Sequence, residues 1–185
     1  MPIILMRHGK PDGLSSQRLS AQAMTQWTAD YDRALIGDDM PPQRCIDIAR
    51  QAAIVVASPL PRALASLEKL GLNATFTDPL FREVALPSLP LATPALPPAL
   101  WLSLLRLLWL CGYSGSVESF RHARQRAVQA ASRLISLSEQ GTVLLAGHGI
   151  MNKLIARELR RQGWLAEKHA SSRYWSTAVY HRSFL

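Results

Sequence analysis

A chain of 185 residues, 48% of them apolar, can bury one substantial core, which excludes extensive disorder and leaves little length for a second domain. Its formal net charge of +8 is compatible with a nucleic acid, an anionic membrane or an acidic substrate as partner. Cys45 and Cys111 are too few for a disulfide framework and lack metal-ligand spacing, and no signal peptide opens the chain. We therefore expect a cytoplasmic protein with reduced thiols.

Short apolar runs bounded by turn residues predict the buried strands of a mostly parallel sheet. In chain order they fall at residues 2–6, 53–57, 74–77, 142–147 and 175–181, and the last alternates enough to predict an edge strand. Amphipathic stretches between them predict helices at residues 20–35, 42–52, 60–70, 117–138 and 150–162. Strands that alternate with helices predict a three-layer α/β/α sandwich.

Residues 85–113 differ in composition from the rest of this predicted single domain, and we interpret them as a cap insertion. The first half is rich in proline and cannot form a regular helix or a central strand. The second half, residues 99–111, predicts an apolar helix interrupted by Ser103 and Arg106, too short to span a membrane. A buried core helix, a lid over an active site, a homodimer interface and a membrane-surface contact all remain open for it.

The basic residues gather most densely at residues 121–126 and 157–161, on predicted helices where charge is typical of a solvated face. No basic stretch is interleaved with aromatic residues, and no known nucleic-acid motif is present, so we expect no nucleic-acid partner.

Cationic and imidazole side chains follow three of the predicted buried strands. Arg7 and His8 come after the first strand, Arg62 follows the second, and His148 lies between two glycines after the third. Ligands bind outside the carboxyl ends of the strands in open α/β sheets, so these four side chains can converge on one crevice. Guanidinium groups and a strand-to-helix turn suit the oxygens of a phosphate group.

Two imidazoles in such a pocket indicate more than anion binding. A neutral imidazole can attack phosphorus and hold the phosphoryl group covalently, which divides a difficult hydrolysis into two displacements. The second imidazole and the arginines would stabilise charge on the equatorial oxygens. A carboxyl group is still needed to protonate the leaving alkoxide.

Five stretches of the chain, in order, resemble motifs of the histidine phosphatase superfamily, in the branch that includes the cofactor-dependent phosphoglycerate mutases. They are LMRHG, ASPLPRALASLEKLG, DPLFREV, ESFRHARQRA and VLLAGHG, and together they extend over nearly the whole chain. The resemblance implies a phosphoglycerate mutase-like fold and a metal-independent phosphatase without a cofactor.

The resemblance also assigns roles to residues. His8 would become the phosphohistidine, while Arg7, Arg62 and His148 would hold the phosphoryl oxygens. Ser58 and Gly149 would complete the phosphate-binding turns. Glu83 would protonate the leaving group and then activate water.

The sequence departs from the family in two places. It lacks the longer insertions of the mutases, which favours hydrolysis of a phosphomonoester over mutase-type phosphotransfer. After Glu83 the stretch VALPSLPLATP replaces the family's usual glycine- and tryptophan-containing turn, so an apolar cap favours a small-molecule substrate with a hydrophobic or bulky body. Mutase-type transfer, a protein phosphohistidine phosphatase and a catalytically silent phosphate-binding module remain as alternatives.

Other candidate polar residues receive no catalytic role. His122, His169 and His181 have no matching context, and we expect them to be surface or structural residues. Lys10 is either solvated or reaches a second phosphate on the substrate.

Overall fold

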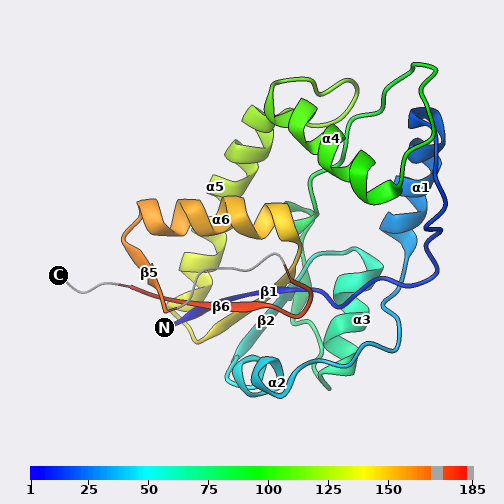
Figure 1. Cartoon of the computed structure of the whole chain (residues 1–185). Coiled ribbons are helices and arrows are strands. Elements are labelled where there is room, and N and C mark those ends of the chain that lie inside the picture. Colours follow the sequence, from blue (N-terminus) through cyan, green and yellow to red (C-terminus); the bar gives the residue numbers. More distant parts are fainter. Residues whose placement is uncertain (168–172, 183–185) are drawn as a thin grey trace.

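The computed structural model, which describes residues 1–167 and 173–182, is built on one six-stranded sheet (Figure 1). The strand order is β3-β2-β4-β1-β6-β5. Four neighbours are parallel: β3 (Phe76–Thr77), β2 (Ile54–Ala57), β4 (Val143–Gly147) and β1 (Ile3–Arg7). The strand β6 (Thr177–Arg182) is antiparallel to β1, and β5 (Trp164–Ala166) is antiparallel to β6.

Helices cover both faces of the sheet and make the predicted three layers. On one face, Ile3 and Leu5 pack with apolar residues of α5 (Phe120–Ser138) and α6 (Gly149–Arg161). On the other face, Ile4 and Met6 pack with residues of α2 (Gln43–Ala49) and α3 (Pro61–Lys69). Successive side chains of a strand point to opposite faces, so one apolar run supplies both cores.

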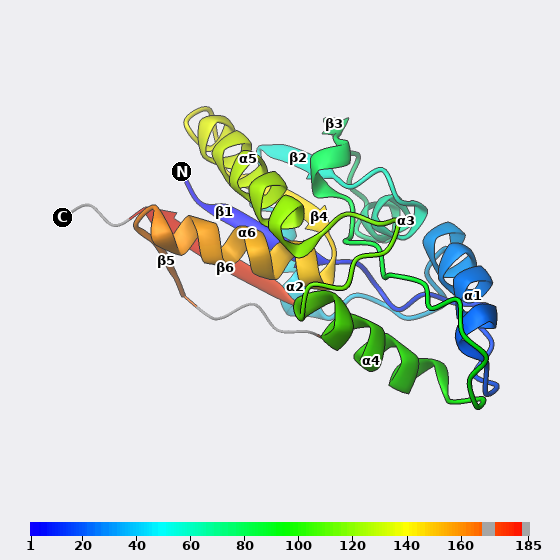
Figure 2. The same cartoon turned by 90° about the horizontal axis from the view of Figure 1, so that it is seen from above.

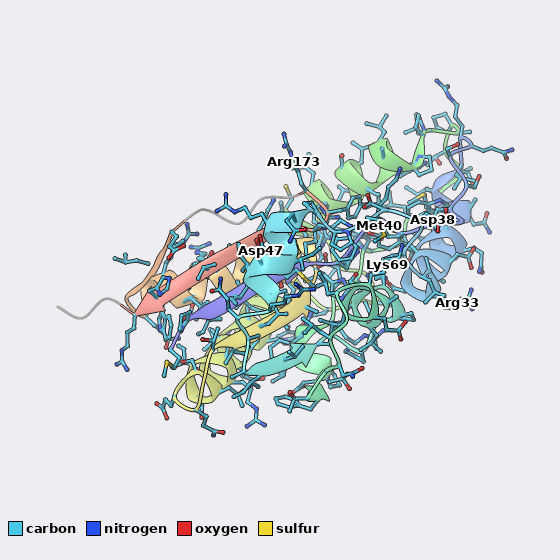
Figure 3. The ribbon with its side chains drawn as sticks, turned by 90° about the horizontal axis from the view of Figure 1, so that it is seen from below. Arg33, Asp38, Met40, Asp47, Lys69 and Arg173 are labelled. Atoms are coloured by element: carbon cyan, nitrogen blue, oxygen red, sulfur yellow. The ribbon has the colours of Figure 1, made fainter. Side chains whose placement is uncertain are left out.

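The second face is the one seen from below in Figure 3, where α2 with Asp47 crosses in front of the strands. At its border Lys69 donates a hydrogen bond to the carbonyl of Gly37, which ties the end of α3 to the loop that carries Asp38 and Met40.

Helices α1 (Ala21–Arg33) and α4 (Pro98–Leu110) lie at the end of the molecule opposite the chain termini (Figures 1 and 2). They share a small separate core of Ala21, Met24, Trp101 and Leu105. The proline-rich segment before α4 forms no helix or strand, as predicted, and is held by an isolated bridge between Leu19 and Leu96.

Only one side of α4 is buried, so of the alternatives left open for this helix a fully buried core helix does not fit. Trp101, Leu105 and Trp109 face inward, whereas Leu104 and Leu107 are exposed. The helix therefore covers the end of the sandwich as a cap, with an apolar outer face.

The prediction missed one strand, and its element boundaries differ from those of the structure by up to three residues. The strand β5 was not predicted, and because it pairs with β6, the expectation that β6 is an edge strand is wrong. It has only three residues after a turn in which Gly163 has a φ of 83°, so it lacks a run long enough to recognise. The helix α5 begins at Phe120 because the Ser119 side chain accepts the His122 N–H and caps it.

No helix within residues 1–167 and 173–182 is long and apolar enough to cross a membrane.

A leucine-to-alanine substitution should lower the free energy of unfolding by different amounts on the two sides of α4. Leu105, which is 2% exposed, loses packing against α1 when changed to alanine, and we expect a loss of about 2 to 3 kcal/mol in the free energy of unfolding. Leu107→Ala on the same helix, where the side chain is 58% exposed, should change it by about 0.5 kcal/mol or less. Urea denaturation of both variants checks this, and equal losses would contradict the packing of α4 on α1.

Candidate active site

The register of the parallel strands brings three strand ends to one edge. Ala146 of β4 pairs with Met6 of β1 and with Ala57 of β2, so the next residues of all three strands leave the sheet together. The backbone continues this alignment beyond the strands, because His8 N–H donates to the Gly147 carbonyl at 3.1 Å. Sequence reasoning predicted this convergence from strand ends alone.

The two imidazoles of His8 and His148 lie side by side in the interior. Their ring centroids are 5.0 Å apart, and the residues are 1% and 0% exposed. They therefore share one site at the sheet edge and do not point into separate cavities.

One hydrogen bond fixes the tautomer of His8. Its Nδ1 lies 2.7 Å from the carbonyl oxygen of Gly9, and because a carbonyl oxygen only accepts, Nδ1 carries the hydrogen. Burial first, then the charges of Arg62 and Arg7, lower the pKa of His8 to about 3, although the bond to Gly9 opposes this. At neutral pH the ring is uncharged and Nε2 keeps its lone pair, as a nucleophile requires.

The loop that carries His8 is held on both sides. Gly9 N–H donates to the Ser66 hydroxyl at 2.9 Å, and that hydroxyl donates to the Arg62 carbonyl at 2.6 Å. A Cβ at Gly9 would lie 2.4 Å from Cζ2 of Trp175, so only glycine fits beneath that ring. Neither Ser66 nor Trp175 was recognised from the sequence.

A second hydrogen-bonded chain orients His148. Its Nε2 lies 2.7 Å from the Ser58 hydroxyl, which also accepts the Leu60 N–H at 3.3 Å. The hydroxyl hydrogen can then be donated to Nε2, which leaves Nδ1 as the protonated nitrogen of the neutral ring. Within the described residues this buried Nδ1 has no hydrogen-bond partner. Burial and the charge of Arg62 lower the pKa of His148 well below its ordinary value.

Each predicted phosphate-binding arginine rests on a tyrosine ring. The guanidinium of Arg7 lies 4.3 Å from the ring centroid of Tyr174, and that of Arg62 lies 4.5 Å from Tyr31. Burial raises the pKa of Tyr31 to about 12, so this ring stays neutral beneath the cation. The tyrosines were not predicted, because nothing in their local sequence marks them.

Arg62 is 0% exposed and its charge is already compensated by protein groups. Nη1 donates to the Tyr31 carbonyl at 2.9 Å, and both Nη atoms lie 3.2 Å from Oδ1 of Asp32. The Asp32 side chain is 45% exposed. A phosphate oxygen at Arg62 would therefore share the guanidinium with a carboxylate that can turn toward solvent.

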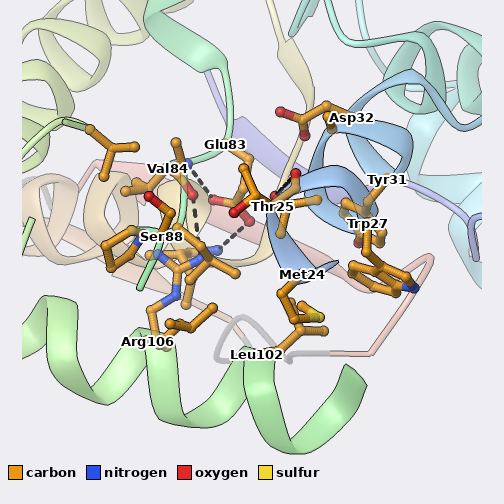
Figure 4. Close-up of a pocket in the computed structure, with 18 of the residues that line it drawn as sticks. Met24, Thr25, Trp27, Tyr31, Asp32, Glu83, Val84, Ser88, Leu102 and Arg106 are labelled. Carbon is orange, nitrogen blue, oxygen red and sulfur yellow. Dashed lines mark hydrogen bonds between the residues drawn. The ribbon is translucent and has the colours of Figure 1, made fainter. Parts of the chain in front are cut away.

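The carboxylate of Glu83 caps the helix that follows His148. Oε2 accepts the Ile150 N–H at 3.1 Å, and Oε1 accepts the Met151 N–H at 3.0 Å. Oε1 also accepts the Val84 N–H at 3.0 Å (Figure 4). These contacts satisfy free donors of the first turn of α6 and place a negative charge at its positive end. They fix Glu83 beside Gly149.

Arg126 positions the segment that leads to Glu83. Its Nη1 donates to the carbonyls of Leu80 at 2.8 Å and Arg82 at 2.9 Å, while its other nitrogens pair with Glu118. The Glu-Ser element before α5 therefore acts through Arg126 on the backbone that carries Glu83.

A cavity of about 520 Å³ opens above this edge, a size typical of small-molecule sites. Arg7, Arg62, Glu83 and Gly149 are among its lining residues, whereas the buried His8 and His148 are not. Its walls come from α1, α4 and the segment between Glu83 and α4 (Figure 4). The large apolar side chains of the lining include Met24, Trp27, Leu86, Leu102, Leu105 and Val117.

The remaining polar candidates lie elsewhere. Lys10 and His122 are exposed, and the exposed His181 lies 2.7 Å from Glu167. His169 falls outside the described residues. No group of three histidine, cysteine or acidic side chains is placed to hold a metal ion within the part of the chain that the structure describes.

Comparison with known families identifies the superfamily of the chain. The sequence model of the histidine phosphatase superfamily (branch 1) matches residues 43–179, about three quarters of the chain. The chain belongs to this superfamily. The matched region includes Arg62, Glu83 and His148, and it begins after the segment that carries Arg7 and His8.

Solved structures share the fold at low sequence identity. The protein of open reading frame Rv3214 from Mycobacterium tuberculosis matches with a TM-score of 0.64 at 16% identity, over 100% of this chain and 96% of that one. A phosphoserine phosphatase mutant from Entamoeba histolytica in complex with phosphoserine has a TM-score of 0.58 at 15% identity, over 96% and 89%. A phosphoglycerate mutase from Thermus thermophilus has a TM-score of 0.58 at 18% identity, over 96% and 92%. No curated protein matches the sequence.

The neutral state of His8 predicts how stability depends on pH. The pKa of His8 is about 3 in the folded protein and 6.5 ordinarily, so as pH falls below 6.5 the unfolded chain takes up this proton first. We expect the free energy of unfolding to fall by up to about 1.4 kcal/mol per pH unit from this group alone. In His8→Gln the free energy of unfolding should fall less steeply between pH 6.5 and 4 than in the wild type, as measured by urea denaturation.

His122→Gln is the matched control, because that residue is exposed, and it should keep the wild-type dependence. The same pH dependence in His8→Gln as in the wild type would show that the ring is not held neutral.

Proposed function

We propose that this protein is a phosphatase that hydrolyses phosphomonoesters through a phosphohistidine on His8. The observation that carries the proposal is the uncharged imidazole of His8, with Nδ1–H held by the Gly9 carbonyl, next to a second imidazole and to the charges of Arg62 and Arg7. Some proteins of similar structure are named phosphatases, one in complex with phosphoserine and one for glucosyl-3-phosphoglycerate, which supports this direction.

In the first step, Nε2 of His8 forms a bond to phosphorus while the bond from phosphorus to the ester oxygen breaks. The leaving alkoxide takes a proton from the carboxyl group of Glu83. Arg7, Arg62 and Nδ1–H of His148 donate to the equatorial oxygens, where charge accumulates in the transition state. Ser58 acts through His148 by holding its tautomer.

In the second step, the Glu83 carboxylate takes a proton from water, whose oxygen attacks phosphorus. The bond from phosphorus to Nε2 breaks and its electron pair returns to the ring, which releases inorganic phosphate. Neither step uses a metal ion.

Chain length does not separate hydrolysis from mutase-type transfer. The chain covers 92% of the phosphoglycerate mutase from Thermus thermophilus, so the absence of longer insertions is not decisive. The two reactions differ in whether water or a second alcohol reaches the phosphohistidine. Turnover is favoured over silent phosphate binding because Glu83 lines the same cavity as both arginines.

The substrate body is proposed to be hydrophobic. Met24, Leu102 and Leu105 line the cavity and offer no hydrogen bonds to sugar hydroxyls, although serine and threonine side chains also belong to the lining. An apolar group there would displace water from an apolar surface, which stabilises the complex by about 25 cal/mol per Å².

Rapid-quench kinetics with an aryl phosphate labelled in the phosphoryl group tests the covalent step. The wild type should form an acid-labile phosphoenzyme transiently, and His8→Ala should form none. Glu83→Gln should accumulate it, because an aryl leaving group needs no proton whereas water still needs a base, and its turnover should fall about 10²- to 10⁴-fold.

His122→Ala serves as the control and should behave like the wild type. A phosphoenzyme in His8→Ala, or turnover of the wild type with no labelled intermediate, would refute the proposed mechanism.

A panel of phosphomonoesters tests the apolar wall. With equal leaving-group pKa, kcat/KM should rise from ethyl to hexyl phosphate by about threefold per added methylene that contacts the wall. Compact sugar phosphates should be poorer than the longer alkyl esters. Leu102→Ser should flatten the series, and a preference for sugar phosphates would contradict a hydrophobic substrate body.

A further inference from the structure

Arg106 is the one charged side chain of α4, and it lines the catalytic cavity from the cap. Figure 4 shows its guanidinium reaching from the helix toward Glu83 and Ser88. The sequence marked it only as an interruption of an apolar helix.

The guanidinium is poorly satisfied by the protein. Nη2 donates a long hydrogen bond of 3.4 Å to the Val84 carbonyl, and the group lies 5.2 Å from the ring centroid of Trp109. Nη1 is buried and has no hydrogen-bond partner among the described residues. Burial of an arginine without an ion pair is costly, so the group is expected to serve a ligand.

No acidic side chain of the described residues forms an ion pair with Arg106. The acidic group that acts on it is Glu83, whose charge opposes the lowering of the Arg106 pKa by burial. The carboxylate of Glu83 is already occupied by the three backbone donors of Ile150, Met151 and Val84. The unpartnered Nη1 of Arg106 can therefore donate to an anion from outside the described residues.

We propose that Arg106 binds a carboxylate on the alcohol part of the substrate, so that the preferred substrates are phosphomonoesters with an apolar spacer and a carboxylate end. This rests on the proposed function, because it assigns the phosphate to Arg7 and Arg62, which line the same cavity. A singly charged carboxylate suits the position better than a second phosphate, since Glu83 beside it would repel a dianion.

Binding and turnover of matched ligands test the proposal. The ligands are alkyl phosphates from ethyl to hexyl and the same esters with a terminal carboxylate. In the wild type, the carboxylate ester of the best chain length should have a kcat/KM about tenfold to a hundredfold above its uncharged partner, the factor expected of one charge-assisted hydrogen bond. Arg106→Gln should remove this preference by raising KM for the carboxylate esters. Its kcat/KM for the uncharged esters should stay within about twofold of the wild-type value.

Lys153→Gln is the matched control. This lysine lines the same cavity from α6 but is exposed, so its removal lowers the local positive charge without changing the buried contact. It should keep the carboxylate preference. Arg106→Lys retains the charge but not the planar fork, and should keep only part of the preference.

Calorimetry on His8→Ala with the same ligands separates this inference from the proposed function, because it measures binding without turnover. A carboxylate preference there that Arg106→Gln abolishes supports the inference even if no hydrolysis occurs. No preference in the wild type, a preference retained in Arg106→Gln, or an equal loss of kcat on both ligand classes would overturn it. The last result would mean that Arg106 acts on Glu83 and not on the substrate.

Discussion

The parallel pairing of β1 and β2 with the central strand β4 is the constraint on which the site depends. Because Met6 and Ala57 are both in register with Ala146, the residues that follow these strands emerge at one edge of the sheet. A shift of one residue in either pairing would turn His8 or Ser58 toward the opposite face. The apolar residues on both faces of the three strands hold this register, so the core and the site are specified together.

Burial then sets the chemistry at this edge. Two arginines are kept charged next to two imidazoles that are kept neutral, because desolvation and the neighbouring cations act in the same direction on the rings. The arginines are tolerated there because each lies on a tyrosine ring and Arg62 also has Asp32. The result is a pair of cationic guanidinium groups next to two uncharged imidazoles, the arrangement on which the proposed attack on a phosphoryl group depends.

Residues of α4 and α6 line the cavity at this edge of the sheet. Glu83 also lines this cavity and caps the helix that begins after His148. Arg126 holds the backbone before Glu83, and α4 places Arg106 beyond it. The Glu83 carboxylate is therefore fixed by backbone N–H groups of α6 and of Val84, and it lines the same cavity as Arg106.

The sequence by itself determined the layers, the four parallel strands and the group of Arg7, His8, Arg62 and His148, because periodicity and strand ends are local properties that the parallel sheet converts into position. Glu83 was placed in the group by resemblance alone. Only the tertiary structure brought Tyr31, Asp32, Tyr174, Ser66 and Arg126 to the site and turned Arg106 inward. These contacts join residues far apart in the chain through hydrogen bonds and ring stacking, which leave no periodic signal in the sequence. The position of β5 was likewise decided by pairing with β6, because three residues carry too little pattern to fix a strand.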